Sequence, residues 1–323
     1  MALPTRPLGS SGLEITTVGF GAWAAGRGWF DGQGPQGDAT CIAAMRRALD
    51  LGVNWIDTVS ANSLRHSEEV VGRLVRQLPE GGRPYIFTTC GEMGHSTSGM
   101  VEPCSLLTLD SIRENCEASL LRLGIQQIDL YQFHWPDYTG IAVEDLWSAM
   151  RKLVEEGKVR AVGGSNLPVE LLERCEEIGH VDSLQPPFSL MNRGAADNEI
   201  PWCGNHRTGV LCWLPSGDWR RDSAALNPPK PECNLALEDA LRLIARRYDT
   251  TIACVATAWT LVWPGVTAAI VGSRSPEQVD GWIGAASLQL TPTDLEEIAS
   301  ALNRPVQMSE RSGKDVTESK RAE

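Results

Sequence analysis

Short β-rich runs alternate with amphipathic helical segments along most of this 323-residue chain. Runs typical of strands lie at 17–21, 54–59, 85–90, 128–134, 161–166, 183–187, 210–215 and 268–272. Segments with helical periodicity lie between or after them, at 39–51, 67–78, 108–123, 143–157, 168–178, 234–248 and 252–263. This alternation of eight strand runs with helical segments predicts an α/β protein, a closed parallel (β/α)8 TIM barrel wrapped in helices.

An open, doubly wound sheet is the alternative architecture for the same order of elements. Its dinucleotide-binding turn is missing, because Gly19-Phe-Gly21 continues as Ala22-Trp23-Ala24 and not as Gly-x-Gly-x-x-Gly. Before the first barrel strand, residues 6–9 and 13–15 flank Ser10-Ser11-Gly12, which predicts a β-hairpin that plugs one end of the barrel. We therefore expect one barrel domain over residues 1–303 and a disordered, charged tail over 304–323.

Charge and composition narrow the classes of partner. The chain has 29 Lys and Arg against 41 Asp and Glu, a net charge of −12, which argues against a nucleic-acid partner. It has no apolar run near the roughly 18 residues that cross a bilayer, so we expect no membrane partner. The nine cysteines are scattered without a Cys-x-x-Cys pair, which predicts no metal site and a reducing, cytoplasmic location.

Chemistry in a (β/α)8 barrel gathers at the carboxyl ends of the strands. His134 ends a predicted strand in Tyr-Gln-Phe-His-Trp-Pro, and this position favours a functional role over a structural one. Asp57 also ends a strand, but an Asp followed by Thr can simply cap the next turn. The other candidates at strand ends are Thr89, Cys90, Ser165, Asn166, Gln185, Trp213, Gly272, Ser273 and Arg274.

Several sequence blocks, in order, resemble the aldo-keto reductases. They include Gly52-Val-Asn-Trp-Ile-Asp57-Thr, His66-Ser-Glu-Glu-Val-Val-Gly72, the run from Leu120 to His134, and Ile270-Val-Gly-Ser-Arg274. The resemblance runs from about Arg6 to Leu302. It implies the same barrel, NADPH bound across the strand ends, and reduction of aldehydes and ketones.

The resemblance also implies four catalytic positions, of which this chain keeps two. Asp57 and His134 stand at the family's aspartate and histidine, whereas Asn62 replaces its proton-donating tyrosine and Thr89 replaces its lysine. Asn cannot give up a proton at neutral pH, and Thr supplies no positive charge. Without the lysine, burial should raise the pKa of Asp57, and Asp57 with His134 could then perform acid and base steps.

Some of the positions at which the family binds its cofactor keep the family's residue types in this chain, and others do not. By resemblance, Ser165, Asn166 and Gln185 would hold the nicotinamide amide, and Trp213 would stack on the ring. The segment that would grip the adenosine 2′-phosphate of NADP(H) contributes Gly272, Ser273, Arg274 and Gln278. Against this, Trp282 replaces the family's adenine-binding Asn, and the glycine-leucine run over the pyrophosphate is absent. The polar residues at the strand ends could therefore also be inherited groups without a ligand.

Tryptophans gather in segments expected at the active face. Trp23, Trp29, Trp135 and Trp219 would line a pocket for a bulky or aromatic small molecule, or pack loops against the barrel rim. Three functions stay open from the sequence. The first is altered, non-reductive chemistry such as elimination, isomerisation or cyclisation. The others are NADPH-dependent carbonyl reduction with a replaced proton donor, and binding of a nucleotide or metabolite without turnover.

Overall fold

Eight parallel strands close into a barrel in the computed structural model, which describes residues 2–23, 34–60, 65–79, 81–90, 109–134, 141–213 and 235–302. The strands are β3 (Val18–Gly21), β4 (Trp55–Asp57), β5 (Tyr85–Cys90), β6 (Ile128–His134), β7 (Val159–Ser165), β8 (Ser183–Gln185), β9 (Gly209–Trp213) and β10 (Ala268–Gly272). Each pairs with its neighbours in chain order, and β10 closes the ring against β3. The predicted (β/α)8 barrel is confirmed.

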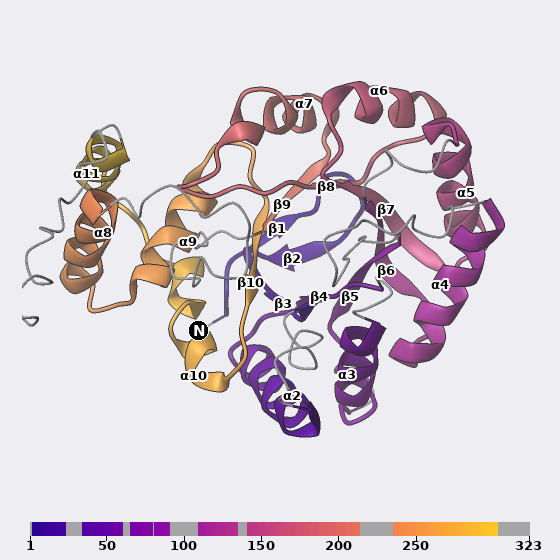
Figure 1. Ribbon diagram of the computed structural model, residues 1–323, viewed down its shortest axis with the longest axis horizontal. Helices are drawn as coiled ribbons and strands as arrows, with labels where there is room; N and C mark the ends of the chain where they lie inside the picture. Colours follow the sequence, from indigo (N-terminus) through magenta and orange to yellow (C-terminus); the bar gives the residue numbers. More distant parts are fainter. Residues whose placement is uncertain are drawn as a thin grey trace, which may run out of the picture.

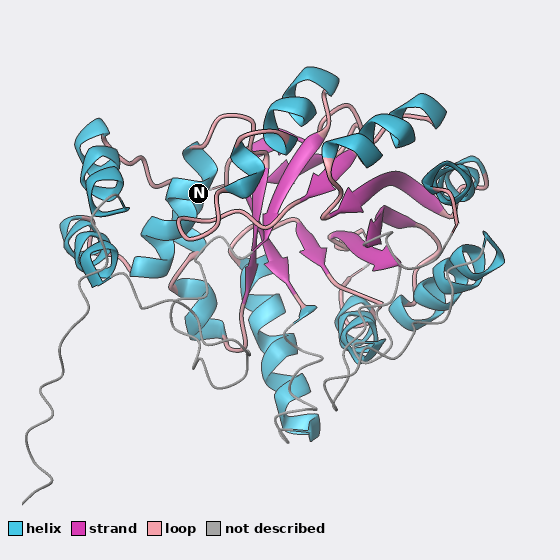
Figure 2. Cartoon of the chain, turned by 45° about the horizontal axis from the view of Figure 1, so that its top comes forward, coloured by secondary structure: helices cyan, strands magenta, loops and turns pink. Residues whose placement is uncertain are grey.

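Helices surround the strands, as Figures 1 and 2 show. They are α2 (Gly34–Asp50), α3 (Arg65–Val75), α4 (Leu109–Leu123), α5 (Val143–Glu155), α6 (Val169–Ile178), α7 (Glu199–His206), α8 (Leu235–Arg247), α9 (Ile252–Val262), α10 (Pro276–Asp280) and α11 (Pro292–Leu302), with 3-10 turns η1 (Gly194–Ala196) and η3 (Ile283–Ala286). The sequence did not predict α7, α10 and α11. The first two are too short to show a helical period, and α11 begins at a proline whose preceding Thr291 pairs with Asp294.

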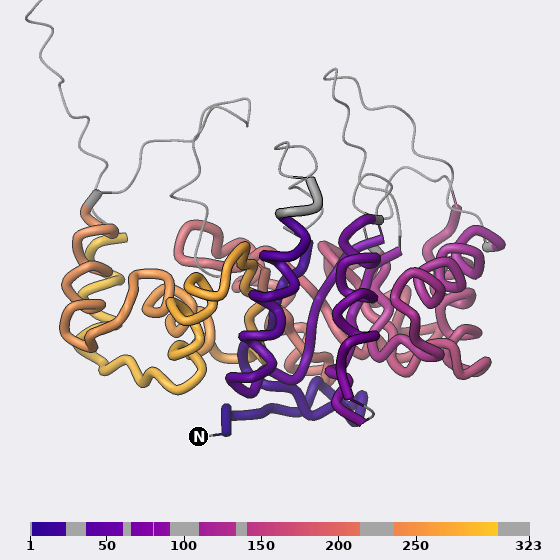
Figure 3. The backbone as a smooth tube through the Cα atoms, turned by 90° about the horizontal axis from the view of Figure 1, so that it is seen from below, coloured from indigo at the N-terminus to yellow at the C-terminus, as the bar shows by residue number. Residues whose placement is uncertain are grey.

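The N-terminal hairpin closes one end of the barrel, as predicted. Strands β1 (Thr5–Pro7) and β2 (Glu14–Thr16) pair antiparallel, and Figure 3 shows this indigo segment lying across that end. The hairpin buries Leu8, Leu13 and Ile15 completely, in one cluster with side chains from six of the barrel strands. These apolar contacts hold the hairpin as the floor of the barrel.

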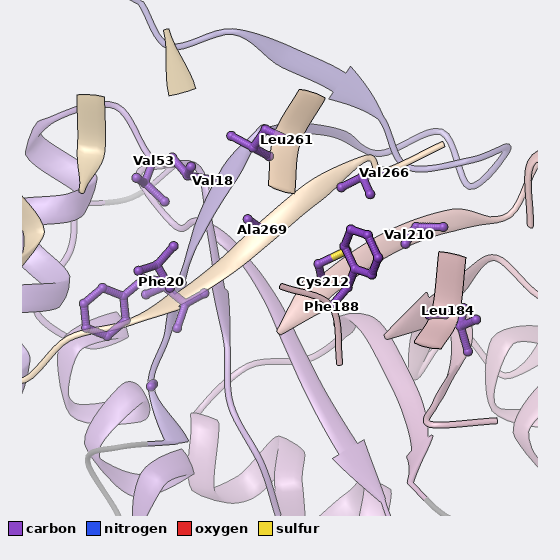
Figure 4. Packing of buried hydrophobic residues seen from close by; sticks show 14 of the residues in the cluster. Val18, Phe20, Val53, Leu184, Phe188, Val210, Cys212, Leu261, Val266 and Ala269 are labelled. Carbon is purple, nitrogen blue, oxygen red and sulfur yellow. The ribbon is translucent and has the colours of Figure 1, made fainter. Parts of the chain in front are cut away.

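Alternate residues of the strands face the barrel interior and the helices. The interior cluster includes Trp55, Phe87 and Leu130, and the two aromatic rings lie 5.0 Å apart between centroids. The outward residues belong to a larger cluster under the helices, part of which Figure 4 shows along β3, β10 and β9. The same alternation points Asp57, two residues after Trp55, into the barrel above the hydrophobic floor.

Substituting Gly19→Ala on β3 is expected to destabilise the fold. A Cβ at Gly19 would lie 2.1 Å from Cε2 of Trp55, which is fully buried and donates from Nε1 to the Thr16 carbonyl oxygen at 2.8 Å. Overpacking a fixed ring costs about 1–3 kcal/mol of unfolding free energy, measurable by urea denaturation. The control is Gly204→Ala on α7, where nothing lies within 4 Å of the added Cβ and where stability should hold or rise. Equal stability of the two variants would show that Trp55 can move.

Candidate active site

Asp57 lies at the centre of a polar layer inside the barrel. It ends β4, is 3% exposed, and its Oδ1 accepts a hydrogen bond from Gln185 Nε2 at 3.0 Å and a longer one from Gln132 Nε2 at 3.4 Å. Strand β8, which carries Gln185, stands opposite β4 in the ring, and β6, which carries Gln132, stands between them. Side chains of alternate strands share one layer in such barrels, and here three of those strands supply polar groups.

The surroundings of Asp57 make its carboxyl a group that titrates near neutral pH. Burial raises the pKa of Asp57 from 3.8 to about 7, although the two glutamine amides act in the opposite direction by stabilising the ionised form. In the described part of the chain, no lysine or arginine pairs with this carboxylate. The sequence-based expectation of a raised pKa is confirmed in direction.

Thr89 occupies the strand-β5 position at which the family resemblance places a lysine. It is 2% exposed and lies beside Gln132 in the β5–β6 register. Its carbonyl oxygen accepts a hydrogen bond from the Ser60 hydroxyl. The side chain at this position is therefore buried and neutral.

Four predicted cofactor residues form one hydrogen-bonded chain at the strand ends. Ser165 donates from Oγ to Gln185 Oε1 at 3.2 Å, and Asn166 donates from Nδ2 to Ser165 Oγ at 3.4 Å. Trp213 donates from Nε1 to Asn166 Oδ1 at 3.2 Å. Asn166 adopts a left-handed backbone, with φ of 59°, which turns the chain at the end of β7. The structure brings these residues together and connects them to Asp57 through Gln185.

In the predicted 2′-phosphate segment at the end of β10, some polar groups already form hydrogen bonds within the protein. The Ser273 hydroxyl is buried and accepts a hydrogen bond from Nε1 of the buried Trp282 at 2.7 Å. Gln278 uses Oε1 to accept from the Arg274 backbone N–H at 2.7 Å, and both of these side chains are exposed. Gly272 is also exposed. The Ser273 hydroxyl is therefore engaged within the protein, while Arg274 reaches solvent.

Trp23 packs on the rim of the barrel. Its ring atoms lie 3.1 Å from the position of a Cβ on Gly21 and 3.6 Å from that of a Cβ on Gly272, at the ends of β3 and β10. It is half-buried. A rim position of this kind fits both of the roles that the sequence left open, packing and contact with a substrate.

Several predicted site residues lie wholly or partly outside the described residues. Only the backbone of His134 is described, and it pairs in register with Ser165. Asn62, Trp29, Trp135 and Trp219 fall in the segments that are not described. Their proposed roles stay predictions.

Gln132 is the site residue that sequence reasoning missed. It is fully buried, and its amide donates to Asp57. The available signal was its place two residues before His134 on one strand, which puts both on the same face. The predicted site therefore extends one layer deeper into the barrel than the strand ends.

The described residues show neither a metal cluster nor a membrane span. Within these ranges, no group of three His, Cys, Asp or Glu side chains could hold a metal ion. None of the helices described there is long and apolar enough to cross a bilayer. The seven described cysteines are buried free thiols, so they pack as small apolar residues.

The aldo/keto reductase family model matches residues 17–303. The chain belongs to the aldo/keto reductase family. The NADH-specific methylglyoxal reductase of Escherichia coli (strain K12) is 30% identical over 328 residues, which cover 92% of this chain and 99% of that protein.

Solved structures of the aldo/keto reductase family show the same barrel. A glycerol dehydrogenase from Gluconobacter oxydans superposes with a TM-score of 0.79 at 26% identity, over 96% of this chain and 99% of that chain. An aldo-keto reductase from Klebsiella pneumoniae in complex with NADPH gives a TM-score of 0.72 at 25% identity, over 94% and 97% of the two chains.

The positions that the family resemblance assigns to NADP(H) fit that cofactor better at one end than at the other. At the nicotinamide end, Ser165, Asn166 and Trp213 remain grouped at the strand ends, although Gln185 already bonds Ser165 and Asp57. At the adenosine end, the Ser273 hydroxyl is engaged by Trp282. The fit to NADP(H) is therefore incomplete at the adenosine end.

Proposed function

We propose that this aldo/keto reductase family member catalyses proton transfer on a small carbonyl compound through Asp57. The reaction class is elimination, isomerisation or cyclisation, without the tyrosine and lysine used by the family. The observation that carries this proposal is the Asp57 carboxyl, buried without a cation in the described part of the chain, with its pKa raised to about 7. A general acid or base works best when its pKa lies near the operating pH.

Asp57 can act in both directions of proton transfer. In its neutral form it donates a proton to a developing oxyanion or leaving group, and in its ionised form it accepts one from carbon or oxygen. His134 ends the strand that carries Gln132, and we assign it the complementary acid or base role. Asn62 would donate a hydrogen bond to the substrate carbonyl, and Thr89 would leave Asp57 without a charge partner.

The substrate is proposed to be bulky or aromatic. Trp23 lies at the barrel rim. In the sequence, Trp29, Trp135 and Trp219 come after the ends of β3, β6 and β9, respectively. Aromatic side chains supply large contact areas in small-molecule pockets.

Carbonyl reduction with a replaced proton donor is the second candidate. The grouping of Ser165, Asn166 and Trp213 favours it, as do relatives whose names include a methylglyoxal reductase and a complex with NADPH. When bound, the nicotinamide would supply the hydride. Asp57 would then be the group that holds the proton for the carbonyl oxygen.

Deuterium exchange distinguishes the two candidates across a broad set of carbonyl compounds. A panel of aliphatic and aromatic aldehydes and ketones would be incubated in D2O with the protein, with and without NADPH, and followed by NMR and nicotinamide absorbance. We expect carbon-bound deuterium or a rearranged product that forms without NADPH consumption. Product that appears only in step with NADPH oxidation would replace the proposal by reduction. Saturable NADPH binding with neither signal would point to a protein that binds without turnover.

A further inference from the structure

The two hydrogen bonds to Asp57 meet on a single oxygen. Gln185 and Gln132 both donate to Oδ1, at 3.0 and 3.4 Å, and the described residues provide no hydrogen-bond partner for Oδ2. A proton on Oδ1 would point toward N–H donors, whereas a proton on Oδ2 leaves both amide bonds intact. The two oxygens of this carboxyl are therefore chemically distinct.

Ser165 supports one orientation of the Gln185 amide. The single Ser165 hydroxyl proton lies nearer to Gln185 Oε1, at 3.2 Å, than to the Gln185 backbone carbonyl oxygen, at 3.4 Å, and the bond to Oε1 keeps the NH2 group toward Asp57. The Ser165 hydroxyl in turn accepts from Asn166 at 3.4 Å. Gln132 has no such support, because its buried Oε1 is without a partner in the described part of the chain. Gln185 is thus a constrained donor to Asp57, and Gln132 is a weaker one.

We propose that Gln185 and Gln132 are positioning residues for Asp57, which hold Oδ1 as a permanent acceptor and place the transferable proton on Oδ2. This inference rests on the proposed role of Asp57 in proton transfer. It also gives Gln185 a function toward a side chain of the protein, where the family resemblance implies contact with the cofactor amide. The pH at which Asp57 loses its proton then depends on the two amides.

No other described titratable group faces Asp57 from the neighbouring elements. Strand β3 lies beside it with Gly21, and β5 faces the interior with Phe87 and Thr89, none of which titrates. Cys90 and Tyr131, on β5 and β6, belong to the outer cluster under the helices. On β6, two other titratable residues remain. Asp129 pairs with Arg83 and accepts from the Ile86 backbone N–H, and the side chain of His134 lies outside the described residues.

The test is a titration of Asp57 itself, which needs no substrate. The protein would be labelled with aspartate carrying 13C in the carboxyl group, and the Asp57 signal would be assigned by its loss in Asp57→Asn. The variants are Gln185→Met and Gln132→Met, which keep similar volume and remove the N–H donors. We expect the midpoint to rise by about one pH unit for Gln185→Met, and by less for Gln132→Met with its longer bond.

Two further variants provide a control and an independent test of the Gln185 orientation. Gln127→Met removes an amide that donates to the Gly157 carbonyl oxygen at the surface, and its Asp57 midpoint should equal that of the unmodified protein. Ser165→Ala keeps Gln185 but frees its amide to rotate, so it should raise the midpoint by less than Gln185→Met. If Gln185→Met does not fold, Gln132→Met and Ser165→Ala carry the test.

The outcomes separate the inference from the function on which it rests. An Asp57 midpoint near 4 in the unmodified protein would overturn both the proposed function and the inference. A midpoint near 7 that does not move in Gln185→Met, Gln132→Met or Ser165→Ala would overturn the positioning role alone. An upward shift in the site variants, with none in Gln127→Met, would support it.

Discussion

Asp57→Asn is expected to lower the rate of proton transfer by at least about 100-fold, the lower end of what general acid–base catalysis contributes. The change keeps the shape of the side chain, and the remaining oxygen can still accept from Gln185 and Gln132. Only the titrating group is lost. Initial rates of deuterium exchange or product formation, measured against a substrate found in the carbonyl panel, provide the measurement.

The same substitution should stabilise the fold at alkaline pH. Because the pKa of Asp57 is raised from 3.8 to about 7, this group favours the folded state most at low pH, and its contribution is lost as pH rises toward the folded-state value. Between pH 5 and pH 7, stability should fall by about 1.4 kcal/mol per pH unit, or on the order of 3 kcal/mol. Asp57→Asn should remove this dependence, so urea midpoints should differ least near pH 4, at the unfolded-state pKa, and favour the variant increasingly up to pH 8.

The two readouts together identify the role of Asp57. Lost turnover with gained alkaline stability is the pattern of a buried, functional carboxyl. Unchanged turnover in Asp57→Asn would exclude Asp57 as the proton-transfer group. Equal pH dependence of stability in both proteins would show instead that its carboxyl titrates normally.

Arg122→Met is expected to reduce the free energy of unfolding by about 3–5 kcal/mol, because it leaves a buried carboxylate without its partner. Glu68, on α3, is completely buried, and Arg122 on α4 approaches its Oε2 to 2.6 Å. Thr88 on β5 donates to Glu68 Oε1 at 2.7 Å. This cluster fastens two helices to the strand that carries Thr89, and urea denaturation would measure its loss.

Two comparisons show whether the unpaired charge of Glu68 causes the loss of stability in Arg122→Met. Arg113→Met breaks an ion pair with Glu156 in which both side chains are partly exposed, and its loss of stability should be much smaller than that of Arg122→Met, because solvent screens the pair. The double variant Glu68→Leu with Arg122→Met replaces the buried pair by apolar groups and should recover much of the lost stability. A double variant as unstable as Arg122→Met would mean that packing of the Arg122 stem, and not charge, dominates.

The chain order of strands and helices was readable from the sequence because hydrophobic periodicity is a local property. It predicted the closed barrel, the hairpin floor and the places of Asp57, Ser165, Asn166, Gln185 and Trp213 at strand ends, and the structure describes all five there or directly after a strand. Short helices such as α7 and α10 were missed, since a few residues cannot display a period.

Contacts across the barrel were decided only by the tertiary structure. Alternation along β6 places Gln132 on the inner face, but the closure of the ring determines that β6 and β8 bring their glutamines to one oxygen of Asp57 on β4. The bond from Trp282 to Ser273 likewise depends on how η3 returns against the end of β10. A sequence pattern fixes which face a residue occupies, whereas the register and closure of the sheet fix which distant residues it meets.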